Sequence, residues 1–315
     1  MGAFLHAVGV FFHHLAAVRW DAFGLAIACQ LLKLLLRASA WRAILQAAYP
    51  ATRVRYWGTF GAMIAGGGVN AILPARGGEL IKLYLVHKRI PGSTYSTLAP
   101  TLLVETIFDM LVAGALLVWA LTIGVLPAHE VYARIPTVDW KFFLRHELLT
   151  GILLLVLAVL VAAGLLWAHA RVERFGEQFR QGFAALRDRP RFLRTVVLPQ
   201  ALSWLCRIAT LFFFLRAFRI HATVHNALLA QVVESLATLF PATPGGAGTK
   251  QGLIVFLFRH QAVSRTELLA FSVGMNIALS AVSILLGLAA IGLMARTLSF
   301  KRLRVLSQRS GQPAG

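Results

Sequence analysis

Residues 148–168, LLTGILLLVLAVLVAAGLLWA, form an uncharged apolar run that indicates a lipid environment for this part of the chain. A helix needs about 20 apolar residues to cross the hydrocarbon core of a bilayer, and this run supplies them. Other apolar stretches recur along the chain, and 58% of its 315 residues are hydrophobic whereas 14% are charged. The sequence therefore predicts an all-α integral membrane protein that crosses the bilayer several times.

The basic residues gather between the apolar runs, and the formal net charge is +19. Arginine and lysine recur in 37–56, 169–194 and the tail 296–309. This distribution is typical of cytoplasmic loops that face an anionic leaflet, and it argues against nucleic acid as a partner. We expect a multi-pass protein of the bacterial inner membrane with a cytoplasmic C-terminus. Arg216 and Arg219 are the exception, because the same scheme places them outside.

Two segments interrupt the apolar pattern with proline and glycine: VNAILPARGGELIK at 69–82 and ATLFPATPGGAGTK at 237–250. Pro74 and Pro241 have matching places in these segments, and the apolar spans around them recur at a spacing similar to that of the two prolines. The odd number of elements between the copies gives them opposite orientations. Inverted repeats with Gly/Pro-broken segments at matching positions are typical of membrane transporters.

Span count and charge agree on one topology, in which each broken segment enters and leaves the bilayer on the same side as a re-entrant helical hairpin. Broken backbone at membrane depth is tolerated only where it is buried in protein or lines a wet cavity. The expected organisation is a first repeat at 1–126 with a re-entrant hairpin at 57–88, an extracytoplasmic loop at 127–147, a second repeat at 148–294 with a re-entrant hairpin at 226–260, and a basic cytoplasmic tail at 295–315.

The two breaks are the first candidates for a substrate site. Each leaves a half-helix whose N-terminal N–H groups can bind an anion, and glycine lets the backbone approach a ligand closely. A plain kink between packed helices is the alternative interpretation. Lys82 also lies at the first break. The candidate substrate-binding residues are Asn70, Pro74, Arg76, Gly77, Gly78 and Glu79 in the first break, and Pro241, Pro244, Gly245, Gly246, Gly248 and Lys250 in the second.

Ionisable residues inside the predicted spans complete the candidate site, because charges at membrane depth usually face the bundle interior. Glu105 and Asp109 are four residues apart and share one helix face. Arg207 and Glu234 are the candidates of the second half, and Lys33 precedes Arg207 by nearly the repeat spacing. Basic and acidic groups together suit a phosphate or zwitterionic headgroup. An ion-pair network that only holds helices together is the alternative.

Several polar residues have plainer interpretations. For Lys33 and Arg37, we expect the side chains to snorkel to the cytoplasmic surface. The histidines within 6–14 are expected on a solvated or interfacial helix face. Cysteine and histidine give no metal-site pattern, and no GxxxxGK[ST] nucleotide loop occurs, so we expect neither a metal ion nor a cofactor.

Five groups of residues also form a family pattern: Arg37-Ala38 with Trp41-Arg42 and Leu45, Asn70 to Glu79, Val104-Glu105 with Asp109, Ser203-Trp204, and Pro241 to Thr249. On these residues the chain resembles the membrane domain of lysylphosphatidylglycerol synthases and their stand-alone YbhN-like relatives, a flippase-like family. Two departures are visible. The family often has arginine where Thr106 follows Glu105, and glutamate soon after the second glycine-rich stretch, where this chain has Thr249-Lys250-Gln251.

The resemblance implies that the protein moves a lipid or lipid-linked molecule between leaflets and is not an enzyme. The expected partners are the bilayer and a membrane lipid, with a homodimer as one candidate assembly. The headgroup stays open between a hopanoid, an anionic phospholipid, an aminoacylated lipid and a polyprenyl-linked sugar. The alternatives are a membrane-embedded enzyme that acts on a lipid-linked substrate, and a regulatory membrane subunit of a lipid-synthesis system.

Overall fold

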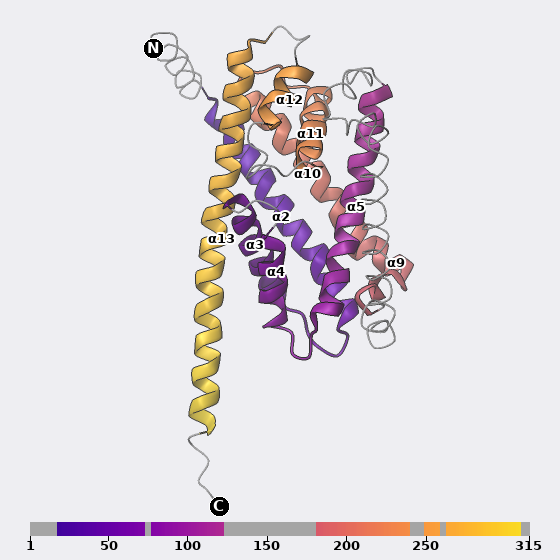
Figure 1. The fold of residues 1–315 in the computed structure, drawn as a ribbon, viewed down its shortest axis with the longest axis vertical. Coiled ribbons are helices and arrows are strands. Elements are labelled where there is room, and N and C mark those ends of the chain that lie inside the picture. The colour runs from indigo at the N-terminus through magenta and orange to yellow at the C-terminus, as the bar shows by residue number, and fades with distance from the viewer. Residues whose placement is uncertain (1–17, 73–76, 123–180, 240–248, 259–262, 310–315) are drawn as a thin grey trace, which may run out of the picture.

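The computed structural model of the chain describes residues 18–72, 77–122, 181–239, 249–258 and 263–309, and all regular elements in these ranges are helices (Figure 1). The all-α prediction is therefore confirmed. Four helical segments are long and apolar enough to cross a membrane: Trp20–Ala48, Tyr95–Ala120, Arg189–Ala217 and Arg265–Met294. The predicted span at 148–168, the loop at 127–147 and the histidines of 6–14 lie outside the described residues.

The same order of elements occurs twice: a long helix, a short pair, and a second long helix. The matching members of the short pairs are 17 and 16 residues long, and 10 and 9 residues long. This order agrees with the predicted repeat. The first set is α2 (Trp20–Ala48), α3 (Tyr56–Ile72), α4 (Gly78–His87) and α5 (Tyr95–Thr122). The second set is α10 (Leu198–Ala217), α11 (Val224–Leu239), α12 (Thr249–Leu257) and α13 (Arg265–Arg309).

Helices α2 and α10 run antiparallel along the middle of the bundle. Before α2, the backbone N–H of Arg19 donates to the carbonyl of Ala217, at 2.9 Å. The rings of Phe23 and Phe214 meet edge to face, with 5.6 Å between their centroids. Near the opposite end of the pair, Val196 is buried against the C-terminal half of α2. The first helices of the two sets therefore point in opposite directions, as an inverted repeat requires.

Helices α3 and α4 form an antiparallel pair, and glycines at their contact allow the two backbones to approach closely. The backbone N–H of Gly78 donates to Oδ1 of Asn70, at 2.7 Å. A Cβ atom added to Gly66 would lie 2.7 Å from the carbonyl oxygen of Gly78, so no other residue fits this crossing without a shift. At the far end of the pair, Gly58 faces the side chain of Arg89. The pair has the form of a broken hairpin, and its re-entrant position in a membrane stays a prediction.

A second glycine crossing joins α3 to α13. A Cβ atom on Gly68 would lie 2.8 Å from the Cα of Gly287, and one on Gly61 would lie 2.9 Å from Sδ of Met294. Small residues at helix crossings are the usual means of close packing in membrane bundles. Helix α13 thus ties the short pair of the first set to the second set, and its C-terminal part extends past the other helices in Figure 1.

The chain reaches α10 through a turn of 3-10 helix (Ala184–Leu186), the short helix α9 (Arg189–Phe192) and one π-helical turn (Leu193–Val197). Gln181 donates from Nε2 to the carbonyl of Ala48 at 2.7 Å, which satisfies the C-terminal end of α2. A Cβ atom on Gly182 would lie 2.6 Å from Cβ of Pro100. This segment therefore packs against both α2 and the start of α5.

The buried apolar residues gather in two main clusters, and α2 contributes to both. Ala26 packs with Phe214 and Phe271 in one cluster. Ala38 and Trp41, further along α2, pack in the other cluster with α3 and α4. Lys33 and Arg37 of α2 occur between the residues of these two clusters, so the fold places its polar site between two apolar cores.

Candidate functional site

Arg37 of α2 binds two carboxylates of α5. Its Nη2 lies 2.6 Å from Oε1 of Glu105 and 2.8 Å from Oδ2 of Asp109. Its Nε donates to the same Glu105 oxygen at 2.9 Å. The four-residue spacing places both acids on one helix face, as predicted from the sequence. Arg37 therefore does not snorkel to the surface as expected, because these two acids hold its guanidinium against α5.

Lys82 of α4 binds the other oxygen of Glu105. Its Nζ lies 2.9 Å from Oε2 of Glu105, and it sits 4.3 Å from the centroid of the Trp41 ring. The side chains of Lys82 and Glu105 are 7% and 4% exposed. A buried carboxylate is stable when such basic groups pair with it and satisfy its oxygens. Glu105 thus connects α2, α4 and α5 through one side chain.

The network continues to α10 through Trp204. Its Nε1 donates to Oδ1 of Asp109 at 2.9 Å, and the guanidinium carbon of Arg207 lies 4.9 Å from the centroid of the Trp204 ring. In the part of the chain that the structure describes, Arg207 has no carboxylate within 4 Å. A cation over an indole face gains a weak attraction and keeps its donors free for a ligand.

Lys33 lies close to Arg207 along the α2–α10 pair. The two cations repel each other, and Glu234 and Asp109 partly offset the positive charge of Lys33. Like Arg207, Lys33 forms no ion pair with a described residue. The sequence predicted that these two residues occupy matching positions, and the structure places them on the paired helices α2 and α10, close enough for their charges to interact.

The second set of helices carries an ion pair of its own. Nζ of Lys250 on α12 lies 2.7 Å from Oε2 of Glu234 on α11, and each side chain is 14% exposed. The other oxygen of Glu234 is buried and has no hydrogen-bond partner among the described residues. Lys82 and Lys250 are separated by nearly the repeat spacing, and each is on the short helix that follows a glycine-rich break. Lys82 and Lys250 each neutralise a carboxylate inside the bundle.

One cavity of about 960 Å³ is lined by Arg37, Lys82, Glu105, Asp109, Trp204 and Arg207 of this network. This volume lies in the range of small-molecule sites, roughly 300–1,000 Å³. On its lining, Leu103 and Met110 are 44% and 64% exposed, so the cavity borders the apolar outer face of α5. The polar lining residues are Arg37, Asn70, Glu79, Lys82, Glu105, Thr106, Asp109, Trp204, Arg207 and Ser235. The apolar ones are Ala99, Leu102, Leu103, Met110, Ala113, Gly114, Leu117, Val232 and Leu236.

Five predicted site residues therefore line one cavity: Asn70, Glu79, Glu105, Asp109 and Arg207. Gly77 and Gly78 are at the start of α4, and the pair of Glu234 and Lys250 lies on the adjacent helices α11 and α12. Substrate binding by these residues stays a prediction. The other seven candidates lie outside the described residues: Pro74, Arg76, Pro241, Pro244, Gly245, Gly246 and Gly248.

Sequence reasoning missed the parts played by two tryptophans. Trp41 supports Lys82 with its ring and donates from Nε1 to Oγ1 of Thr101 at 3.2 Å. Trp204 links Asp109 to Arg207. Both occur in the family pattern, and an indole N–H inside an apolar span is a donor that needs an acceptor. That requirement is the signal that could have assigned them to the site.

The comparisons with known proteins agree with the resemblance found in the sequence. The model of the family "Lysylphosphatidylglycerol synthase TM region" matches residues 3–302. A UPF0104 membrane protein from Methanocaldococcus jannaschii is 20% identical over 204 residues, which is 61% of this chain and 79% of that protein. No solved structure gave a significant match.

Proposed function

The chain belongs to the family of the lysylphosphatidylglycerol synthase transmembrane region, and on that premise we propose that it moves a lipid or lipid-linked molecule between the leaflets of the bacterial inner membrane. The family match covers nearly the whole chain, so the proposal concerns the membrane domain itself. Four apolar helices in the described residues support a multi-pass protein. Translocation, the identity of the membrane and the side of the C-terminus are the proposed parts.

The observation that carries the proposal is the mixed lining of the central cavity. A lipid that changes leaflets must take a polar headgroup through hydrocarbon, where unpaired polar groups cost several kcal/mol each. Arg37, Glu105 and Arg207 provide a charged lining that can replace the water around such a headgroup. Leu103 and Met110, on the same lining, are exposed on the outer face of α5. The acyl chains can therefore stay in the membrane while the headgroup crosses inside the protein.

The short pairs α3–α4 and α11–α12 would form the moving or lining parts of this path. Each carries one lysine bound to a carboxylate inside the bundle, Lys82 to Glu105 and Lys250 to Glu234. Asn70, at the end of α3, organises the start of α4 through the N–H of Gly78. We propose that the two pairs are re-entrant hairpins that meet the headgroup from opposite sides of the membrane, as the inverted repeat implies.

Leaflet exchange in proteoliposomes tests the proposal. Purified protein is reconstituted with trace fluorescent lipids, and the fraction that an external quencher cannot reach is followed with time. We expect protein-dependent exchange of at least one headgroup class, and its loss in Glu105→Gln. Glu267→Gln at the exposed start of α13 is the matched control, because glutamine can keep the cap that Glu267 makes to the N–H of Ser264.

The result also separates the alternatives. No exchange of any lipid class by folded wild-type protein would contradict the proposal. Recovery of a chemically altered lipid from the same vesicles would instead indicate a membrane-embedded enzyme. Arg207→Gln is a second variant that removes no ion pair within the described residues, so its effect on exchange does not depend on the stability of the Glu105 network.

A further inference from the structure

A second arginine-lined cavity lies at the end of the α2–α10 pair where α2 begins and α10 ends. Its volume is about 670 Å³, and Arg19, Arg216 and Arg219 line it together with Phe212 and Ile220. Arg19 is paired with Asp21, at 2.8 Å. Arg216 and Arg219 have no such partner in the described ranges. The preference of basic residues for the cytoplasmic side does not explain Arg216 and Arg219, because the predicted topology places this end outside, where basic residues are depleted.

The backbone at Arg219 shows that an arginine occupies this place against the local preference. Its φ is +59°, the left-handed conformation that ends a helix and that glycine normally provides. The N–H of Ile220 donates to the carbonyl of Leu215 at 3.0 Å, and the N–H of Arg219 donates to that of Arg216 at 3.2 Å. These two bonds define a Schellman motif at the end of α10. A side chain with a Cβ atom is strained there, so arginine ends this helix less favourably than glycine would.

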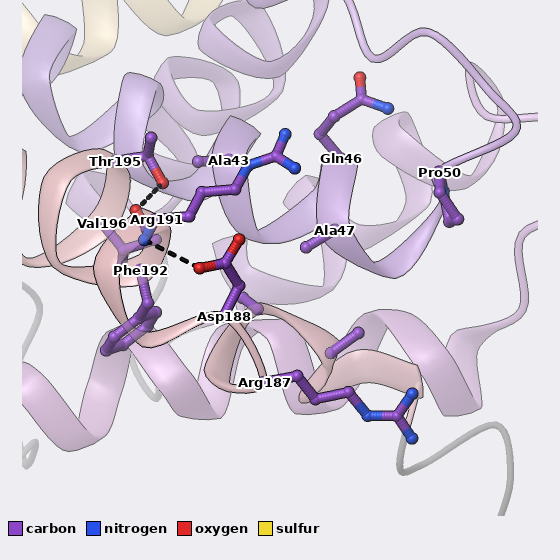
Figure 2. Close-up of a pocket in the computed structure, with 12 residues that line it drawn as sticks. Ala43, Gln46, Ala47, Pro50, Arg187, Asp188, Arg191, Phe192, Thr195 and Val196 are labelled. Atoms are coloured by element: carbon purple, nitrogen blue, oxygen red, sulfur yellow. Dashed lines mark hydrogen bonds between the residues drawn. The ribbon is translucent and has the colours of Figure 1, made fainter.

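A third cavity, of about 400 Å³, lies at the other end of the same helix pair. Arg187 and Arg191 line it opposite Ala43 and Gln46 of α2 (Figure 2). Asp188 is used locally, because its Oδ1 accepts the backbone N–H of Arg191 at 3.2 Å. Within the described part of the chain, neither guanidinium has a carboxylate within 4 Å.

The three cavities are spaced along one helical segment at membrane dimensions. Arg191, Arg207 and Arg216 are all in the continuous helical segment Arg189–Ala217. At 1.5 Å per residue, Arg207 lies about 24 Å from Arg191 and about 14 Å from Arg216 along the axis. The sum is close to the thickness of a bilayer with its headgroup regions, about 40 Å. In a bilayer that this segment spans, the end arginines would therefore fall at headgroup depth and Arg207 within the hydrocarbon.

The charges around the central cavity favour an anion. Among the described residues, the network and its neighbours hold five basic and four acidic side chains, and Arg207 lines the cavity without an ion pair. The departure from the family pattern at Lys250 adds a positive charge on α12. The basic residues are Lys33, Arg37, Lys82, Arg207 and Lys250, and the acidic ones are Glu79, Glu105, Asp109 and Glu234.

From these observations we infer that the three cavities are successive binding sites for the phosphate of an anionic lipid headgroup. The inference rests on the proposed function and names its substrate class. The planar guanidinium binds phosphate through two parallel N–H donors, and at least one arginine lines each of the three cavities. The end cavities receive the headgroup at either membrane face, and Arg207 holds it at the centre. A headgroup with an added lysine is disfavoured, because the carboxylates of Glu105 and Asp109 are already bound by Arg37 and Lys82.

Selectivity in the exchange assay is the first test. Vesicles of phosphatidylcholine carry labelled phosphatidylglycerol, phosphatidylcholine or lysylphosphatidylglycerol in trace amounts. We expect phosphatidylglycerol to exchange about tenfold faster than the other two, and Arg207→Gln to abolish this preference. Equal rates for the three lipids, or an intact preference in Arg207→Gln, would overturn the inference while leaving the proposed function standing.

Binding provides a readout that does not depend on transport. Delipidated protein is mixed with equal amounts of phosphatidylglycerol and phosphatidylcholine, and the retained lipid is measured by native mass spectrometry. We expect retention of the anionic lipid, reduced in a variant that combines Arg216→Gln with Arg219→Gly. Retention without preference would overturn the inference even if no lipid exchanged. Arg53→Gln, an exposed arginine that lines none of the three cavities, is the control.

Arg219→Gly separates loss of charge from loss of fold. Glycine keeps the left-handed conformation at the end of α10 without strain, so this variant should unfold at the same or a higher temperature than wild type while it binds less phosphatidylglycerol. Uptake of labelled inorganic phosphate into the vesicles distinguishes the source of the phosphate. We expect no protein-dependent uptake, and uptake would overturn the lipid assignment in favour of free phosphate.

Discussion

Arg37 of α2 binds Glu105 of α5 through two guanidinium nitrogens, at 2.9 and 2.6 Å from the same oxygen. The other oxygen of Glu105 binds Lys82, so a single acid sets the positions of three helices around the cavity. Removal of one partner from a buried network leaves uncompensated charge, whereas removal of an opposite pair restores the balance. This asymmetry allows the structural and transport roles of Glu105 to be separated.

We expect Glu105→Gln to lower both thermal stability and lipid exchange. The neutral amide leaves Arg37 and Lys82 without their shared counter-charge, and the loss of one partner in a buried ion pair typically costs about 3–5 kcal/mol. Adding Lys82→Met to Glu105→Gln should recover a large part of the lost stability without restoring exchange. The measurement is a double-mutant cycle of unfolding temperature together with exchange rate. Full recovery of exchange in the double variant would show that the network only holds the helices together.

Neighbouring glycines of α3 should respond in opposite ways to alanine. A Cβ atom at Gly66 would lie 2.7 Å from the carbonyl of Gly78, whereas one at Gly67 would meet nothing within 4 Å. We therefore expect Gly66→Ala to force α3 and α4 apart, with lower stability and slower exchange. Gly67→Ala should be neutral or stabilising by up to about 1 kcal/mol, because alanine favours a helix. Thermal unfolding checks both variants, and equal effects would show that the tight crossing does not exist in the membrane.

The indole N–H of Trp204 has a role that a phenylalanine cannot fill. Trp204→Phe removes the 2.9 Å hydrogen bond to Asp109 but keeps a ring beneath Arg207. One hydrogen bond to a charged group contributes about 1.5–3 kcal/mol, so we expect exchange to slow by about tenfold or more. Trp204→Ala should be slower still, since it also removes the support of Arg207. An exchange rate of wild-type size in Trp204→Phe would place Asp109 outside the functional network.

The ion pair of the second helix set should behave as that of the first. Lys250→Met leaves Glu234 buried with neither oxygen bound by a described residue, so we expect a lower unfolding temperature. The double variant with Glu234→Gln should recover part of that loss. Thermal unfolding of the single and double variants in detergent checks this, with Glu267→Gln at the exposed start of α13 as the control. Wild-type stability in Lys250→Met would mean that water, not protein, surrounds this pair.

The order of the helices and the shared face of Glu105 and Asp109 could be predicted from the sequence, because apolar periodicity and residue spacing are local signals. The partners of these acids could not be predicted, because they depend on how α2 and α4 pack against α5. Arg37 illustrates the difference. A basic residue in a span snorkels when only its own helix is considered, but two acids on a neighbouring helix hold it in the bundle.

The equivalence of Lys82 and Lys250 was within reach of the sequence, since their spacing is almost the same as that of Pro74 and Pro241. Spacing alone does not assign both lysines to ion pairs inside the bundle, because a lysine near a break can equally face water. The strained conformation of Arg219 could not be predicted, because no local signal requires a left-handed arginine at a helix end. Both features depend on long-range packing around α10.

A reversible block of the cavity tests the central claim most directly. In a protein with Cys29 and Cys206 replaced by serine, Met110→Cys introduces a thiol on the cavity lining, and Leu205→Cys introduces one on α10 away from it. Both proteins are labelled with a bulky methanethiosulfonate, and lipid exchange is measured before labelling, after it, and after reduction. We expect exchange to stop in the labelled Met110→Cys protein, to return on reduction, and to continue throughout in Leu205→Cys. Undiminished exchange with fully labelled Met110→Cys would contradict a headgroup path through this cavity.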